Sequence, residues 1–227
     1  MFVANFKPLF PMQSTLLSLS VCALVFSPCG ASAATTLGFD KPVNTAIPDN
    51  NDSGLASILG VTDGGQTVTA VQVVLTTHNG WNGDLYAYLE HDGVISVLLN
   101  RPGSTAANPS GSASSGMTLT LADSAPLDIH TAISATAGAL ATGTYQPDGR
   151  AADPGLVTDS SPRSLYLSGF TGQNTAGNWT LFVADLADGG VATLDSWSLS
   201  LTVVPEPGVF LLGGVGLLGM LRRRRIP

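Results

Sequence analysis

Four aspartates in turn-rich segments are the side chains with the clearest capacity for chemistry. Asp84 and Asp185 stand at the ends of predicted strands, while Asp188 and Asp195 flank a Gly-Gly turn. Hard cations such as Ca²⁺ need several oxygen ligands, which loop carboxylates can supply. Aspartates in turns also commonly accept hydrogen bonds from turn amides. The four residues therefore predict either a calcium site or turn-forming side chains, and no other cofactor is indicated.

The established motifs for metals and nucleotides do not fit this chain. Asp49, Asn51, Ser53 and Gly54 match the first half of an EF-hand loop, but its twelfth position is Gly60, where the motif has glutamate. No set of cysteines and histidines has the spacing of zinc ligands. No glycine-rich loop leads from a strand into a helix, so a nucleotide site has no basis.

A protease would need a nucleophile, a base and an orienting acid. Asp52-Ser53-Gly54 resembles a catalytic triplet of subtilases and of aspartic proteases, but no histidine or serine motif of a subtilase follows it. The triplet is therefore interpreted as a turn. The three histidines, His78, His91 and His130, are predicted to be surface or structural residues, and the chain is predicted not to be an enzyme.

The aromatic residues divide into two groups. Trp179 and Trp197 are in phase with aliphatic neighbours, which predicts that both lie in the core. Trp81, Tyr86 and Tyr88 lie close together near the His78 loop. Exposed rings there could stack on sugars or on protein, although core packing or isolated surface rings are commoner outcomes.

The elements that must position these residues are strands. Apolar residues alternate with period two, which is typical of half-buried strands. The runs are Val71 to Leu75, Leu85 to Leu89, Trp179 to Val183 and Trp197 to Val203, with shorter strands expected at Met117 to Leu121, Ser164 to Phe170 and around Tyr145. Asp92-Gly93 predicts a hairpin into Val94 to Leu99. Residues 100–116 are predicted to be a polar loop outside the core. The pattern predicts an all-β fold, an antiparallel jelly-roll-like β-sandwich.

Composition supports this fold class and limits the partners. Charged residues make up 11% of the chain, and 26 glycines and 14 prolines supply many turns, which disfavours coiled coils and helical bundles. Residues 34–204 contain four basic and 15 acidic side chains, a formal charge of −11. Such a charge disfavours nucleic acid as a partner and favours solubility and attraction of cations.

The N-terminal residues 1–33 have the pattern of a secretory signal peptide. Lys7 provides a weak positive region, Leu16 to Phe26 is apolar, and Ala31-Ser32-Ala33 is a small-residue cleavage site before Ala34. Both cysteines lie upstream of that site. The exported chain would therefore contain neither a disulfide nor a thiol.

The C-terminal residues 204–227 combine a breaker, a short apolar segment and a basic stop. Pro205, Glu206 and Pro207 precede the uncharged residues 208–221, which end at Arg222, Arg223, Arg224 and Arg225. The apolar segment predicts a short helix that barely spans a bilayer. The combination resembles the PEP-CTERM sorting signal. That resemblance implies a transient inner-membrane anchor, an exosortase as processing partner, and a Gram-negative producer of exopolysaccharide.

The body resembles a second family. His78 to Leu85 (HNGWNGDL), Gly177 to Asp185 (GNWTLFVAD) and Leu194 to Leu199 (LDSWSL) are similar to motifs of the P/Homo B domain of kexin-like proprotein convertases. The resemblance covers residues 37–203. It implies a jelly-roll β-sandwich that, in that family, stabilises an adjoining subtilisin-like protease.

Two functions follow from these patterns. The first is an exported, non-enzymatic sandwich, located in the outer envelope or extracellular matrix, with a structural or adhesive role in exopolysaccharide or biofilm material. The second is a detached P domain that binds or stabilises a separate secreted protease. Co-purification with polysaccharide or with a protease would distinguish the two.

Overall fold

The structure is a computed structural model that describes residues 33–133 and 140–204. The predicted signal peptide, the Pro-Glu-Pro segment, the short C-terminal helix and the arginine cluster lie outside these residues. Within them, no helix is long and apolar enough to cross a membrane.

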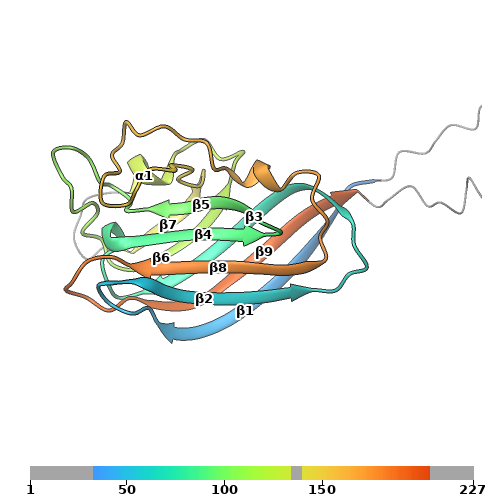
Figure 1. Cartoon of the computed structure of the whole chain (residues 1–227), viewed down its shortest axis with the longest axis horizontal. Coiled ribbons are helices and arrows are strands. Elements are labelled where there is room, and N and C mark those ends of the chain that lie inside the picture. Colours follow the sequence, from blue (N-terminus) through green and yellow to red (C-terminus); the bar gives the residue numbers. More distant parts are fainter. Residues whose placement is uncertain (1–32, 134–139, 205–227) are drawn as a thin grey trace, which may run out of the picture. The chain divides into compact units, whose positions relative to one another are not determined.

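Two stacked sheets form the body, as the alternation predicted. The five-stranded sheet has the order β1-β9-β3-β6-β7 and the four-stranded sheet the order β2-β8-β4-β5. The strands are β1 (Thr35–Ala46), β2 (Asn51–Val61), β3 (Thr67–His78), β4 (Leu85–His91), β5 (Val94–Asn100), β6 (Met117–Ala122), β7 (Ala141–Tyr145), β8 (Gly177–Asp185) and β9 (Thr193–Val204). Figure 1 looks onto the four-stranded sheet, with the five-stranded sheet behind it. The helical elements among the described residues are the single turns η1 (Asn82–Asp84), α1 (Ile129–Ala132) and η2 (Leu167–Phe170).

The core lies between the sheets and contains the side chains that alternation assigned to it. Trp179 and Trp197 are 0% and 1% exposed, which confirms their predicted burial. Each indole N–H is satisfied: Trp179 donates to the Thr175 carbonyl at 3.0 Å, and Trp197 donates to Ser57 Oγ on the opposite sheet at 2.9 Å. Buried tryptophans thus hold the two layers together through both apolar contact and hydrogen bonds.

The predicted hairpin is present, with β4 and β5 joined at Asp92-Gly93. Both turn residues have positive φ, +47° and +79°, as a tight hairpin turn requires. The pairing is antiparallel throughout the described sheets except between β6 and β7, which are parallel. The exception arises because the chain makes a crossover through α1 between these two strands.

Three local predictions were wrong. Ser164 to Phe170 is not a strand but an irregular segment followed by η2, because the Leu167 and Ser168 amides bond the Asp123 carboxylate instead of a sheet. Asp52-Ser53-Gly54 is not a free turn but a bulge within β2, where the register shifts and Gly54 has φ +52°. A Cβ at Gly54 would lie 2.5 Å from the Val183 carbonyl oxygen, so only glycine fits there.

The third wrong prediction concerns the polar loop of residues 100–116, which is partly buried rather than purely external. Ser104, Ser112 and Ser114 are at most 3% exposed. Their hydroxyls are satisfied internally; Asn82, for example, donates to Ser114 Oγ at 2.8 Å. Polar composition does not keep a segment at the surface when its groups find partners inside.

The edge of β5 is covered by residues from a long excursion between β7 and β8. The Asp148 and Gly149 amides donate to the carbonyls of Leu98 and Val97, and the Val97 amide donates to the Leu165 carbonyl. This cover occupies hydrogen-bonding groups that an edge strand would otherwise expose. It also brings Asp148 to the end of β5, beside Asn100.

Candidate functional site

Three carboxylates meet at one end of the four-stranded sheet, on the left in Figure 1. Asp185 is the last residue of β8, Asp84 immediately precedes β4, and Asp49 precedes β2. Sheet pairing brings them together, because Asp185 is opposite both Leu85 and Asn51. The Leu186 amide also donates to the Asp84 carbonyl at 2.9 Å, which ties the end of β8 to η1. Three segments far apart in sequence therefore converge; Asp49, Asp84 and Asp185 are called the acidic cluster below.

Two members of the acidic cluster are buried, Asp49 is partly buried, and the cluster lacks compensating donors. Asp185 is 0% exposed and Asp84 is 4% exposed. Neither carboxylate oxygen of Asp185, nor Oδ1 of Asp49, accepts a hydrogen bond from the described residues. The nearest positive charge is Arg101, whose Nη2 lies 3.7 Å from Asp84 Oδ1. A buried carboxylate without donors is costly, so this arrangement calls for a proton or a cation.

Burial is the main reason why the pKa of Asp185 is raised to about 6. The negative charges of Asp84 and Asp49 raise it further. The amides of Ala187 and Ala192 oppose the shift, but neither lies in hydrogen-bonding geometry with a carboxylate oxygen of Asp185. Burial and Asp49 also raise the pKa of Asp84, against the opposing effect of Arg101.

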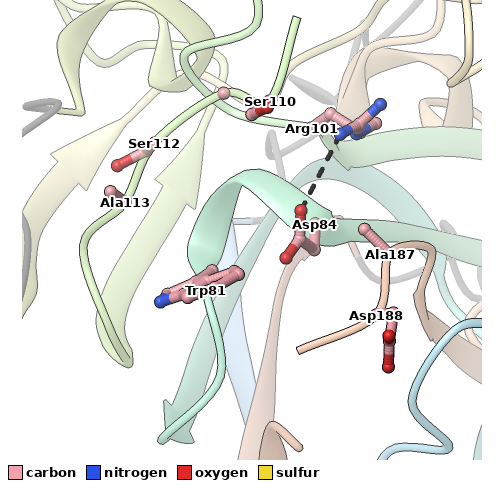
Figure 2. A pocket seen from close by; sticks show the side chains of 9 residues that line it. Trp81, Asp84, Arg101, Ser110, Ser112, Ala113, Ala187 and Asp188 are labelled. Atoms are coloured by element: carbon pink, nitrogen blue, oxygen red, sulfur yellow. Dashed lines mark ion pairs between the residues drawn. The ribbon is translucent and has the colours of Figure 1, made fainter. Parts of the chain in front are cut away.

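A pocket of about 280 Å³ opens beside the acidic cluster. Figure 2 shows Asp84 in the middle of the lining, with Arg101 and Ser110 above it, Ser112 and Ala113 on the left, and Trp81 and Asp188 below. Trp81 is 47% exposed. The Ser110 to Ala113 loop approaches closely because Gly83 has no side chain; a Cβ there would lie 2.4 Å from the Ser112 nitrogen. The pocket thus combines an open indole with charges of both signs.

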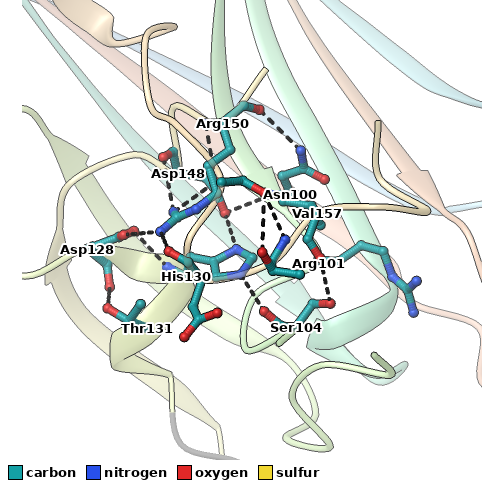
Figure 3. A network of polar contacts seen from close by, with 12 residues as sticks. Asn100, Arg101, Ser104, Asp128, His130, Thr131, Asp148, Arg150 and Val157 are labelled. Carbon is teal, nitrogen blue, oxygen red and sulfur yellow. Dashed lines mark hydrogen bonds and ion pairs between the residues drawn. The ribbon is translucent and has the colours of Figure 1, made fainter. Parts of the chain in front are cut away.

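A second group of buried charges consists of Asp128, His130, Asp148 and Arg150 beside Asn100 and is called the Asp148 network (Figure 3). Asp148 Oδ2 accepts hydrogen bonds from His130 Nδ1 at 2.8 Å and from the Asn100 amide at 3.2 Å, while its Oδ1 accepts from Arg150 Nη1 at 3.2 Å. Arg150 Nη2 also donates to Asp128 at 2.8 Å. Every carboxylate oxygen of Asp148 and Asp128 has a donor, so the negative charges of this network are compensated. Arg150 Nε and Asn100 Oδ1 have no hydrogen-bond partner among the described residues.

The histidines are engaged structurally. His130 Nε2 faces the Ser104 carbonyl at 2.8 Å, so both of its ring nitrogens face acceptors. Its burial opposes the charged form, but the Asp148 contact prevails and the pKa of His130 is raised. His91 is 0% exposed, stacks on Trp179 with ring centroids 4.0 Å apart, and faces two main-chain carbonyls. These geometries fit the structural roles predicted for both residues.

The structure places the four predicted metal ligands in different surroundings. Asp84 and Asp185 come together, and Asp188 lines the pocket beside Asp84. Asp195 instead pairs with His78 Nδ1. No group of three or more His, Cys, Asp or Glu side chains within residues 33–133 and 140–204 is arranged as a formed metal site. The acidic cluster is therefore close enough for electrostatic coupling but does not enclose a common point.

Sequence reasoning missed several residues of these sites. Asp49 was considered only as the start of an EF-hand loop, and Arg101, Asp128, Asp148 and Arg150 were not selected. One signal was present in the sequence: the body has only four basic residues, so each arginine was a good candidate for pairing with a buried acid.

Comparison with known families accounts for two segments of the chain. Residues 156–201, which include η2, β8 and most of β9, match the proprotein convertase P-domain. Residues 203–225 match the PEP-CTERM protein-sorting motif. Both resemblances drawn from the residues are thus confirmed, although the P-domain match is shorter than the expected 37–203. The sorting motif implies export with transient membrane anchoring and exosortase processing.

Full-length comparisons are more distant. No curated protein matches the chain. Two solved structures of the Aeromonas sobria serine protease, one of them in complex with its chaperone, are 18% identical to it. Their TM-scores are 0.44 and 0.43, and they cover 78% and 75% of this chain. The chain spans only 28% and 27% of the length of those proteases.

Proposed function

We propose that this protein is an exported, non-catalytic β-sandwich that an exosortase sorts to the outer envelope or extracellular matrix. There it has a structural or adhesive role in exopolysaccharide material. The observation that carries the proposal is the PEP-CTERM match at residues 203–225, which begins where β9 ends at Val204. The folded body and the sorting motif are thus directly joined, as expected for a cargo and its tag.

The engagement of the Asp-Ser-Gly triplet and of two of the three histidines supports a non-catalytic role. The Asp52-Ser53-Gly54 triplet lies in a strand bulge. The ring nitrogens of His91 and His130 face main-chain carbonyls or Asp148, where they serve the fold. A general base needs a nitrogen free to accept a proton from a nucleophile.

The acidic cluster is proposed to hold calcium in the exported protein. Asp84 and Asp185 would supply carboxylate oxygens, and the orphaned oxygens of Asp185 are the observation that supports the proposal. Because the three carboxylates do not surround a common point, main-chain or water oxygens would have to complete the coordination. Bound calcium would neutralise buried negative charge and fix the end of β8 against η1. The residues themselves position the donors, since sheet pairing holds Asp185 beside the Asp84 and Asp49 segments. Asp188 and Asp195 are not needed for this site.

The P-domain match favours a second candidate, an accessory of a secreted protease. In this case the sandwich would bind a separate protease chain. Purification of the native exported protein distinguishes the two: polysaccharide or self-association favours the matrix role, and a stoichiometric protease favours the accessory role.

The sorting proposal is tested by replacing Pro205, Glu206 and Pro207 together with alanine. Tail removal and delivery to the medium or matrix should both fail, as measured by mass spectrometry of the termini and by cell fractionation. Leu156→Ala, at a side chain that is 79% exposed in the body, is the control for expression and export. Unchanged tail removal and delivery in the triple variant would refute the proposal.

A further inference from the structure

We propose that the pocket around Trp81 binds a neutral carbohydrate, with the indole as a stacking platform. The biological meaning of this inference rests on the proposed matrix role, whereas the binding itself depends only on the pocket. Its volume of about 280 Å³ suits a small ligand or one end of a chain.

The exposed indole is the first observation. All three tryptophans of the chain lie within the described residues, and Trp179 and Trp197 are buried in the core. Trp81 is 47% exposed, and Gly189 lies against its ring, where a Cβ would be 3.0 Å from Cζ3. The face of an aromatic ring is electron-rich and attracts polarised C–H groups, which a sugar ring presents on its less polar face.

The polar lining is the second observation. Arg101 donates from Nε to the Gly83 carbonyl at 3.1 Å, which holds the guanidinium at the pocket wall. Its Nη2 lies 3.7 Å from Asp84, too far for a strong hydrogen bond. The guanidinium therefore keeps donors for a ligand, while Asp84 and Asp188 offer acceptors. Sugar hydroxyls use donors and acceptors together.

The balance of charge in the lining favours a neutral ligand over the other ligand classes. An anionic ligand would meet Asp84 and Asp188 in a body of formal charge −11. A cationic ligand would be attracted by Asp84 and Asp188 but would meet the Arg101 guanidinium beside Asp84, so it would gain less than in a pocket lined by acids alone. A purely apolar ligand would desolvate these charges without replacing their hydrogen bonds. A neutral, polyhydroxylated ligand avoids all three costs.

Because Trp81 is exposed and the other two tryptophans are buried, tryptophan fluorescence of the purified full chain provides a direct binding assay. Acrylamide quenches exposed indoles, so most of the quenchable fluorescence should come from Trp81. Neutral tetrasaccharides of glucose, mannose and galactose serve as probes, with oligogalacturonate and chitosan oligomers as anionic and cationic counterparts. At least one neutral probe should protect the Trp81 fluorescence and bind in isothermal titration calorimetry.

Variants assign that binding to the pocket. Trp81→Ala should weaken the neutral probe at least about tenfold in calorimetry, as expected for a central aromatic contact. Tyr88→Ala is the matched control, because Tyr88 is a half-buried ring outside the pocket that stacks on Phe182. It should leave binding unchanged. Asp188→Asn should change neutral binding only a few-fold, since an amide still accepts a hydrogen bond.

Three results would overturn the inference. The first is that no neutral probe binds. The second is that Tyr88→Ala abolishes binding of the neutral probe while Trp81→Ala leaves it unchanged. The third is that the protein prefers chitosan oligomers and that Asp188→Asn removes this preference. None of these depends on sorting, because the chain is purified before the assay. Failure of the Pro-Glu-Pro variant to block sorting would refute the proposed function and leave the pocket assay intact.

Discussion

The Asp148 network and the acidic cluster bury the same chemical group in opposite ways. Both lie at the end of β5. Asn100 donates to Asp148 in the network, and the next residue, Arg101, lies beside Asp84 of the acidic cluster. The carboxylate of Asp148 has a donor on each oxygen, from His130, Arg150 and the main chain. The carboxylate of Asp185 has none among the described residues.

This difference distinguishes buried carboxylates that stabilise the fold from buried carboxylates that can still bind a ligand. A buried carboxylate with a donor on each oxygen needs no ligand, and its partners fix the loops that they connect. A buried carboxylate whose oxygens accept no hydrogen bond gains much more from a proton or a cation, so it remains available for binding. The predictions below test whether the two regions differ in this way.

The largest effect is expected where the compensated network loses a partner. Arg150→Met would leave Asp148 and Asp128 buried with fewer donors and should lower the free energy of unfolding by about 3 to 5 kcal/mol. Urea denaturation measures the loss. Arg101→Gln, at a more exposed arginine, is the control and should cost less than about 1 kcal/mol. Equal losses in both variants would abolish the distinction between the regions.

Calcium should stabilise the protein through the acidic cluster. At a hundredfold excess over Kd the gain is about 2.7 kcal/mol, or about 5 to 10 °C in Tm for a body of this size. Differential scanning calorimetry measures the shift, which magnesium at equal ionic strength should not reproduce.

Asp185→Asn should abolish the calcium response, and Asp84→Asn should strongly reduce it. Asp195→Asn is the matched control, because Asp195 pairs with His78 and should keep the full response. Equal shifts with both cations would indicate only screening of the net negative charge.

Without calcium, acid should stabilise the native state through Asp185. The pKa of its carboxyl is about 6 in the folded protein, against 3.8 for an unperturbed aspartate, so the folded chain holds this proton more tightly than the unfolded chain. Stability from this group therefore falls as pH rises from about 3.8 to 6, by about 1 to 2 kcal/mol once solvent relaxation is allowed for.

The difference in unfolding free energy between the wild type and Asp185→Asn isolates this titration from that of the other acids. His130 serves as an internal comparison. Its pKa is raised, so its contribution is complete below about 6.5 and is lost as pH rises through its folded pKa. The Asp185→Asn variant should still lose the His130 contribution to stability as pH rises. A pH-independent difference between the two proteins would contradict the assignment.

The smallest effect concerns the cation that already lies near the acidic cluster. Arg101 is 3.7 Å from Asp84 and repels a metal bound there. Arg101→Gln should therefore tighten calcium binding about two- to fivefold, the size expected for a partly exposed charge. Isothermal titration calorimetry measures this change, and weaker binding would show that Arg101 helps to form the site.

The sequence alone determined the features that depend on neighbouring residues. Period-two alternation placed β3, β4, β8 and β9, and Asp92-Gly93 specified the hairpin, because side-chain direction and turn geometry are local properties. The same alternation assigned Trp179 and Trp197 to the core. The PEP-CTERM motif could also be recognised from the sequence, since it is a short contiguous signal.

Only the tertiary structure decided which charges meet. Asp49, Asp84 and Asp185 converge because β2, β8 and β4 are neighbours in one sheet, an order that local patterns do not encode. Ser104 is buried and Ser164 to Phe170 is not a strand because distant groups, His130 and Asp123, bond these segments. The protonation and ligand binding of a carboxylate depend on its burial and on donors from elsewhere in the chain. Position in the sequence therefore suggested Asp84, Asp185 and Asp195 equally as metal ligands, and only the structure distinguished Asp195 from the other two.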